Sequence, residues 1–590
     1  MAALALAVVL PLVDAIGRPL GGFHISGSST YVEMLTLWLA FVGGLVATRE
    51  GKHLTLSTAE LFGDGRPARI ARIFAYSVAA ATVAILAYAS AQVVIADADG
   101  GSMLPIGIPQ WWVETIMPVG LGLMAARFAW HASTSWRGRA VAFASIGAAF
   151  ALGLLPPEQA ARVWPLAFVI VGAALLGAPV FVAMGGVALV LFFKDGTPVA
   201  AVSAEVYRLI ASPTLPAIPL LTACGYVLAE SDAANRLVRF FRALTGWMPG
   251  GMAVMVAAVC ALFTTFTGGS GVTIIALGGL VYPILRKDGY SEGFSLGLVT
   301  ASGSLGLLFP PSLPVILYSV VASVGDTSVP ADSLYLAGLI PGLLLVVLTA
   351  AYGIYIGRGV STGRQVFSWK EAGASAWAAK WELLLPFFVV GLFATGLASM
   401  VETAAAAVAY AVIVECFVTR DIKFFSGLPG VLLRSSSLMG AVLILLAIAM
   451  GLTSYLVDAQ IPAFLLEWVK THIQSPVVFL LALNVLLLVL GSVLEIYSAI
   501  IILAPLVVPM GNAFGINPIH LGVIFLANLE LGFLFPPMGL NLFLSSSRFG
   551  KPLPSLYKHV LPFLVILGIG VLLITYIPWM SLGILQLLGK

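Results

Sequence analysis

The stretch LGLLFPPS, Leu305 to Ser312, places two consecutive prolines in an apolar run, and LGFLFPPM, Leu531 to Met538, repeats it almost letter for letter. Proline removes a helical hydrogen bond and clashes with the preceding turn, at a cost of about 3 kcal/mol inside a helix. Both stretches therefore predict a broken helix. At membrane depth such a break is tolerated only where it is buried in protein or lines a water-filled cavity.

The composition predicts a membrane protein. Apolar residues make up 60% of the 590 residues and charged residues only 9%, whereas a soluble chain carries roughly 25% charged residues. The net charge of +3 is too small and scattered to indicate nucleic-acid binding. The cysteines and histidines are dispersed, and neither a nucleotide-binding P-loop nor a nucleophile–base–orienter set is visible, so we expect no metal cluster and no enzyme.

Charge asymmetry predicts the topology of the first part of the chain. Four apolar segments, at about residues 1–16, 31–48, 70–95 and 111–131, are long enough to cross a bilayer. The loop 49–72 is rich in Lys and Arg, whereas the loop 97–110 carries Asp and neither Lys nor Arg, so the former should be cytoplasmic. We therefore expect a multi-pass membrane protein with a cytoplasmic N-terminus. A fifth segment, about 140–156, reads as a connecting helix.

The rest of the chain is internally repeated. Pro283 is followed 226 positions later by Pro509, and Leu308 to Pro311 match Leu534 to Pro537 at the same offset. Membrane transporters built from inverted repeats place their binding sites at helices interrupted in corresponding positions of the two halves. The predicted domains are a four-helix scaffold unit (1–135), the connecting helix (136–162), a first repeat (163–375) and a second repeat (376–590).

Two further apolar segments predict re-entrant hairpins. The first lies near 212–232, where Pro213, Pro216 and Pro219 crowd together, and the second lies near 435–462. Each segment is too short or too interrupted for two clean spans. An ordinary membrane span with a kink is the alternative in both cases.

The candidate ion chemistry comes from small, hydroxyl-bearing and acidic residues. In FTTFTGGSGVTIIALGG, Phe263 to Gly279, residues Gly269, Ser270 and Thr273 could turn backbone carbonyls and hydroxyls toward a cation such as Na⁺. Close helix packing is the alternative. Glu495 is an intramembrane carboxylate and therefore a functional candidate. Glu530 either binds an ion or proton or hydrogen-bonds a broken helix end, and we assign Glu33 and Glu402 first to structural contacts.

These motifs resemble the membrane part of tripartite ATP-independent periplasmic (TRAP) transporters with the small and large subunits fused. The large-subunit resemblance covers about 163–590 and rests on LPAIPLL, ALGGLVYPILRKDGY, SGSLGLLFPPSLPVILYS, VETAAAAVAY and the run from LEIYSAIIILAPLVVP to NLELGFLFPPMGLNLF. The looser small-subunit resemblance covers about 1–135. The resemblance implies Na⁺-driven uptake of a small, carboxylate-bearing solute that an extracytoplasmic binding protein delivers. It also implies an elevator mechanism, in which a domain with hairpins and broken helices slides against a scaffold.

The resemblance and the repeat together give two sets of candidate residues. The candidates for Na⁺ binding are Gly269, Ser270, Thr273, Gly306, Ser312, Glu495, Asn528 and Gly532. The candidates for solute binding are Pro216, Pro219, Ser270, Pro310, Pro311, Pro536, Pro537 and Asn541. The chain departs from the family pattern at Gly271, where a hydroxyl is usual, and at Glu495, where Asp is usual.

Two other functions stay open at this point. One is a stand-alone H⁺- or Na⁺-coupled anion carrier, with Glu495 or Glu530 as the proton carrier, which needs no binding protein. The other is a membrane scaffold that does not transport. Na⁺ is the one coupling ion expected, no organic cofactor is indicated, and the fused subunits are consistent with a monomer.

Overall fold

The computed structural model describes residues 2–17, 25, 27–53, 55, 65–105, 107–154, 162–323, 328–359, 366–395, 397–494, 496–536 and 539–589. Within these ranges the chain is helical and has no strand, only two isolated bridges. Seven of the described helices are long and apolar enough to cross a membrane: α2 (Ser28–Glu50), α3 (Arg66–Gly100), α17 (Ala331–Gly357), α20 with η2 (Met400–Val418), α21 (Leu428–Asp458), α24 (Ile496–Ala513) and α27 (Leu553–Tyr576). The expected all-α, multi-pass membrane fold is confirmed.

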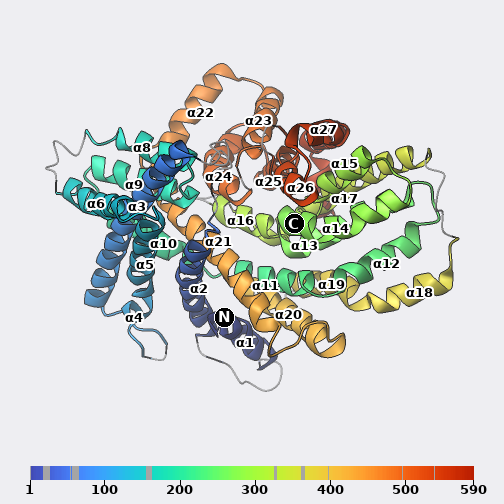
Figure 1. Ribbon diagram of the computed structural model, residues 1–590, viewed down its shortest axis with the longest axis horizontal. Helices are drawn as coiled ribbons and strands as arrows, with labels where there is room; N and C mark the ends of the chain where they lie inside the picture. The colour runs from blue at the N-terminus through green and yellow to red at the C-terminus, as the bar shows by residue number, and fades with distance from the viewer. Residues whose placement is uncertain are drawn as a thin grey trace. The chain divides into compact units, whose positions relative to one another are not determined.

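The chain divides into two compact units, of which the first comprises Met1–Pro219 and Leu432–Leu465. Besides α2, α3 and most of α21 it contains α1 (Ala2–Gly17), α4 (Gln110–Glu114), α5 (Ile116–His131), α6 (Trp136–Leu152), α8 (Leu166–Leu175), α9 (Val180–Lys194) and α10 (Ala200–Ile210). Helix α3 packs along α5 and α6, and α2 packs against α1 and α5 (Figure 1). The four predicted spans thus appear as helices, although the fourth begins with the separate short helix α4.

A glycine contact holds α21 against α2 within this unit. A Cβ atom added at Gly440 would lie 2.1 Å from the backbone carbon of Gly43, and one added at Gly44 would lie 2.8 Å from the Ile444 side chain. Such close approach of two helix backbones is possible only with small residues and is a common way to pack helices in membranes. Near the end of α2, the Ser437 hydroxyl donates to the Glu50 carboxylate at 3.1 Å.

The second unit comprises Leu220–Val431 and Leu466–Lys590. Besides α17, α24 and α27 it contains most of α11 (Ala217–Ala229) and of α22 (Ile461–His472), together with α12 (Ala233–Thr245), α13 (Gly251–Thr267), α14 (Ser270–Lys287), α15 (Glu292–Ser302), α16 (Leu313–Ala322), α18 (Trp369–Ala378), α19 (Lys380–Thr395), α20 (Met400–Ile413), η2 (Val414–Val418), α23 (Pro476–Gly491), α25 (Pro518–Gly532), α26 (Leu540–Phe549) and α28 (Trp579–Leu587). Both helix breaks predicted from the double prolines lie in this unit. The first separates α15 from α16, and the second separates α25 from α26.

The hairpins do not lie where the sequence predicted them. The segment 212–232 contains the single helix α11, because its prolines lie in the turn that precedes the helix and in the first turn itself. The segment 435–462 is almost entirely part of α21, a continuous helix of 31 residues. Its glycines pack against other helices instead of breaking it, as Gly440 does against Gly43. Instead, the consecutive helices that pack against each other across a short turn are α13 with α14 and α23 with α24. These two pairs are the hairpins of the structure.

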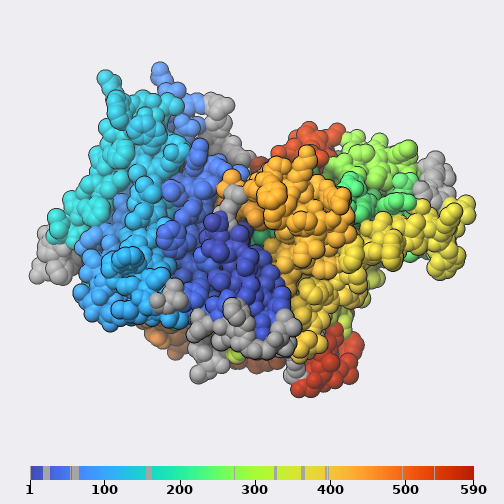
Figure 2. Space-filling view, turned by 90° about the horizontal axis from the view of Figure 1, so that it is seen from below, coloured from blue at the N-terminus to red at the C-terminus, as the bar shows by residue number. Residues whose placement is uncertain are grey.

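Helix α18 forms an exposed edge of the second unit. It is bent by 61° from α19 at a break after Ala378, and Figure 2 shows its surface in yellow. The side chains of Trp369 and Trp377 are 82% and 72% exposed. The Lys380 ammonium lies 3.3 Å from the centre of the Trp377 ring, a cation–π contact.

Candidate functional site

A glycine pair forms the tip of the hairpin α13–α14. Gly268 ends α13 in the left-handed conformation (φ +65°), and its amide donates to the Thr264 carbonyl at 2.9 Å. Gly269 is extended, and α14 begins directly after it at Ser270. A Cβ atom at Gly268 would lie 2.5 Å from the Leu313 side chain, so both the backbone conformation and the space there require glycine.

Three threonine hydroxyls join the two arms below this tip. Thr264 Oγ1 lies 2.8 Å from Thr273 Oγ1, and Thr267 Oγ1 lies 3.4 Å from it. Thr267 also donates to the Gly269 carbonyl at 3.3 Å. All three side chains are buried. The structure therefore brings Gly269 and Thr273, both predicted from the sequence, into one buried polar group.

The first helix break packs directly against α13. The Thr264 hydroxyl lies 2.9 Å from the Gly303 carbonyl oxygen, and the Thr265 hydroxyl lies 3.2 Å from that of Gly306. A Cβ atom at Gly306 would lie 2.1 Å from the Ala261 carbonyl oxygen. Each hydroxyl also lies near a carbonyl of its own helix, at 2.7 Å for Thr264 and 2.8 Å for Thr265. These contacts therefore place hydroxyls of the hairpin beside the carbonyls of the break and bury that break in protein.

The second hairpin and the second break repeat this arrangement with different residues. Gly491, which ends α23, meets Gly532 at the end of α25, where a Cβ atom would lie 2.8 Å from the Gly491 Cα. The Tyr497 hydroxyl on α24 donates to the Gly268 carbonyl at 2.9 Å. The two hairpins are therefore connected through the tip of the first.

Side chains from the second break reach the first. Asn541, at the start of α26, donates from Nδ2 to the Thr300 carbonyl at 3.1 Å and lies 3.3 Å from Ser304 Oγ. The Glu530 carboxyl on α25 is buried, and its Oε1 has no hydrogen-bond partner. Both roles that the sequence allowed for Glu530 therefore stay predictions.

Several buried oxygen atoms in these elements have no hydrogen-bond partner. They are Ser270 Oγ, Ser302 Oγ, Ser312 Oγ, Ser498 Oγ, Asn541 Oδ1 and Glu530 Oε1. Hydroxyl, amide and carboxylate oxygens are the ligands that hard cations prefer. Sequence reasoning missed Ser302 and Ser498. Ser302 could have been found, because the repeat offset of 226 places it on Asn528.

Asn528 lies in a different polar network. Its Nδ2 donates to Asn484 Oδ1 at 2.6 Å, and the Thr575 hydroxyl donates to the same oxygen at 3.2 Å. Asn528 thus links α25 to α23, and Asn484 in turn links α23 to α27. Pro310, Pro311 and Pro536 lie in the two breaks, as predicted.

The remaining candidates cannot be placed with this group. Glu495 and Pro537 lie outside the described residues. Pro216 and Pro219 belong to the first unit. Glu402 has a structural contact, as expected, but a local one: it forms a capping box with Ser399 at the start of α20. In the described parts of the chain, no three His, Cys, Asp or Glu side chains converge as metal ligands.

Known proteins resemble both parts of the chain. Residues 166–580 match the family described as tripartite ATP-independent periplasmic transporter, DctM component, and residues 7–138 match the DctQ component of these transporters. The C4-dicarboxylate TRAP transporter large permease protein DctM of Pseudomonas aeruginosa is 35% identical over 407 residues, which cover 69% of this chain and 93% of that protein.

A relative with both components in its name is also similar. The isethionate TRAP transporter permease protein DctMQ of Oleidesulfovibrio alaskensis is 29% identical over 481 residues, 80% of this chain and 74% of that protein. Among solved structures, the YdaH transporter of Alcanivorax borkumensis aligns with a TM-score of 0.42 and 17% identity over 64% of this chain and 89% of that chain. The relatives are named as permeases, and the chain is a transport protein rather than an enzyme. It belongs to the tripartite ATP-independent periplasmic (TRAP) transporters, with the DctQ and DctM components of the permease in one polypeptide.

Proposed function

We propose that this protein couples the uptake of a small, carboxylate-bearing solute to Na⁺. The observation that carries the proposal is that the hairpins and breaks of the second unit contain several buried oxygens without a hydrogen-bond partner, among them Ser270 Oγ at the first tip. Na⁺ binding there would supply the interactions that these oxygens lack, and it would tie the tip to the broken helices.

Helix ends in the same elements favour an anionic solute. Helices α14, α16 and α26 begin at Ser270, Leu313 and Leu540, next to the tip and the two breaks. Each helix N-terminus carries partial positive charge that stabilises a nearby anion by about 0.3–1 kcal/mol or more. Relatives named for C4-dicarboxylate, isethionate and ectoine transport support a small polar or charged organic solute.

Coupling follows if Na⁺ and solute stabilise the same arrangement of tip and breaks. A ligand shifts a conformational equilibrium only by its difference in affinity for the two states. We propose an elevator movement of the hairpins and broken helices, with an extracytoplasmic binding protein that delivers the solute. The proposed setting is the bacterial inner membrane, with the N-terminus in the cytoplasm and one chain as the working unit.

Uptake into proteoliposomes tests this proposal. The purified chain is reconstituted with and without a cognate binding protein, and uptake of a labelled C4-dicarboxylate, isethionate or ectoine is measured under an inward Na⁺ or K⁺ gradient. The proposal predicts uptake only with both Na⁺ and the binding protein. Uptake without the binding protein, driven by a proton gradient, would instead favour a stand-alone carrier.

Ser270→Ala tests the location of the ion site. The variant should require a higher Na⁺ concentration for half-maximal uptake because it loses one unpaired oxygen. Ser375→Ala is the matched control, since Ser375 is also buried in the second unit but donates to a backbone carbonyl of its own helix at 2.7 Å. Equal Na⁺ dependence of the two variants would place the ion site elsewhere.

A further inference from the structure

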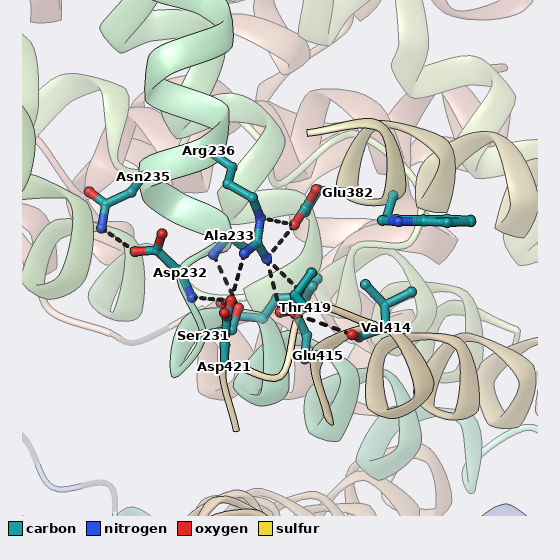
Figure 3. Close-up of polar contacts among 12 residues, drawn as sticks. Ser231, Asp232, Ala233, Asn235, Arg236, Glu382, Val414, Glu415, Thr419 and Asp421 are labelled. Carbon is teal, nitrogen blue, oxygen red and sulfur yellow. Dashed lines mark hydrogen bonds and ion pairs between the residues drawn. The ribbon is translucent and has the colours of Figure 1, made fainter. Parts of the chain in front are cut away.

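One arginine in the second unit is surrounded by three carboxylates (Figure 3). Arg236 on α12 donates from Nε to Glu382 at 2.5 Å and from one terminal nitrogen to Asp421 at 2.6 Å. Its other terminal nitrogen lies 3.1 and 2.9 Å from the two oxygens of Glu415. Glu382 lies on α19, Glu415 on η2 and Asp421 in the turn after η2. This group, the Arg236 cluster, fastens α12 to both segments.

The buried charges of the Arg236 cluster do not balance. The side chains of Glu382 and Glu415 are 1% and 0% exposed, and Arg236 is 14% exposed. Two buried carboxylates thus share one guanidinium, and Asp421, 19% exposed, adds a third negative charge. An uncompensated buried charge costs several kcal/mol, so a bound proton that removes one of them is strongly favoured.

The neighbouring cations Arg239 and Lys380 contact side chains outside the Arg236 cluster. Arg239 on α12 pairs with Glu371 at 2.8 Å at an exposed site, and Lys380 lies over the Trp377 ring. The titratable groups on the elements around the Arg236 cluster are Cys224 and Tyr226 on α11, Glu230 after it, Asp232, Arg239 and Arg242 on or next to α12, Cys260 on α13, Tyr282, Arg286 and Lys287 on α14, Asp288 after it, Lys370 and Glu371 on α18, Lys380 on α19, Tyr410 on α20, Cys416 on η2, and Arg420 and Lys423 after η2. Among these described groups, no ion pair other than those of Arg236 reaches Glu382 or Glu415.

Two observations indicate which carboxyl group holds the proton. Asp421 is partly exposed and accepts from Arg236 at 2.6 Å and from the Asp232 amide at 3.0 Å. Burial alone would raise the pKa of Asp421, but these hydrogen bonds hold that pKa below its ordinary value. Asp421 therefore stays ionised, and the proton belongs on a fully buried carboxyl group. A proton on the unpartnered Glu382 Oε2 would have no acceptor, which leaves Glu415.

The backbone around Glu415 is unusual as well. Residues Val414–Val418 form a π-helix at the end of α20, and such π-bulges occur frequently at functional sites. Arg420, two residues after it, has a positive φ of 62°, a conformation that is uncommon for a residue other than glycine. The Thr419 hydroxyl donates to Glu415 Oε2 at 3.0 Å. The local structure thus turns Glu415 inward, toward Arg236.

We propose that the Arg236 cluster is a proton-binding site, in which Glu415 carries an exchangeable proton and donates it in a hydrogen bond to the Asp421 carboxylate. The partly exposed Asp421 is the route by which this proton exchanges with water. Release of the proton leaves two buried carboxylates beside one guanidinium. The resulting repulsion weakens the attachment of α12 to η2. Because α12 leads into α13, the first arm of the tip hairpin, the bound proton also fixes the connection to the proposed ion site.

Infrared spectroscopy of the purified protein tests this proposal without any transport measurement, so its outcome is independent of Na⁺ coupling. At neutral pH the wild-type protein should show the carbonyl stretch of a protonated carboxyl group, which shifts in D₂O and disappears as the pH rises. Glu415→Gln, which keeps the shape of the protonated acid, should remove the Glu415 component of this band. The wild-type minus variant difference spectrum isolates that component from other buried carboxyl groups such as Glu114 and Glu530. Asp421→Asn should move the disappearance of the Glu415 component to lower pH by about one pH unit or more, because a neighbouring negative charge that favours the proton is removed.

Glu371→Gln is the control, since Glu371 pairs with Arg239 on the same helix but is exposed; it should leave the band unchanged. A wild-type spectrum with no such band, or a band that Glu415→Gln leaves intact, would overturn the proposal. If Glu415→Gln does not fold, Asp421→Asn in the exposed turn still tests the proposal. A band that titrates in this variant at the same pH as in the wild type would also overturn the proposal.

Discussion

The hydroxyl of Tyr497 donates a hydrogen bond to the carbonyl of Gly268 at 2.9 Å, across 229 positions of sequence. One residue belongs to the second repeat and the other to the glycine tip of the first. This bond links the two hairpins at the point where Gly268 turns the chain toward Ser270. The hairpins of the two repeats should therefore respond together to a bound ion.

Tyr497→Phe tests this link. The variant keeps the ring but loses one hydrogen bond, which contributes about 0.5–1.5 kcal/mol. We expect the Na⁺ concentration for half-maximal uptake to rise by about 2- to 10-fold. Tyr576→Phe is the control, because the Tyr576 hydroxyl donates to the Val477 carbonyl at an exposed position. A Na⁺ dependence that Tyr497→Phe does not alter would show that the link has no part in ion binding.

Gly306→Ala should abolish uptake. The added methyl group would lie 2.1 Å from the Ala261 carbonyl oxygen, so the first break and α13 must move apart. Overpacking of this kind costs about 1–3 kcal/mol, which we expect to observe as a lower melting temperature. Gly373→Ala, where a Cβ atom meets nothing within 4 Å, is the control and should be neutral or slightly stabilising. Normal uptake by Gly306→Ala would refute the close contact.

Gly440→Ala tests the packing of the first unit. Its Cβ atom would lie 2.1 Å from the Gly43 backbone, so α2 and α21 could no longer approach as closely. The melting temperature should fall, whereas Gly122→Ala on α5, with open space around it, should leave it nearly unchanged. Equal melting temperatures of the two variants would contradict the glycine contact.

An exposed ion pair gives a small pH dependence of stability. Lys551 Nζ lies 2.6 Å from Glu292, and this hydrogen bond lowers the pKa of Glu292. Because its folded pKa is below its unfolded pKa of about 4.5, the contribution is present at neutral pH and is lost as the pH falls through the folded pKa. Glu292→Gln should slightly lower the melting temperature at neutral pH and leave it unchanged in strong acid. A loss of equal size at both pH values would contradict the pairing.

The sequence predicts the broken helices but not what surrounds them. Proline breaks the helix in which it lies, so Pro310 and Pro536 correctly predict the positions of both breaks. The sequence predicts an ion-binding turn near Gly269 but not the hairpin tip at Gly268 and Gly269. A glycine pair alone does not distinguish a hairpin tip from close helix packing. Contacts such as Asn541 with Thr300 join residues 241 positions apart. The Arg236 cluster joins three segments in the same way, and no local pattern predicts such pairings.

The most direct test of the central claim is Na⁺ binding by the purified protein, followed through its melting temperature. Replacing K⁺ with Na⁺ at constant ionic strength should raise the melting temperature, because a ligand that binds only the folded state stabilises it by mass action. The rise should shrink in Ser270→Ala and persist in Ser375→Ala. A melting temperature that is the same in Na⁺ and K⁺, or a rise that Ser270→Ala leaves intact, would contradict an ion site at the tip of α13 and α14.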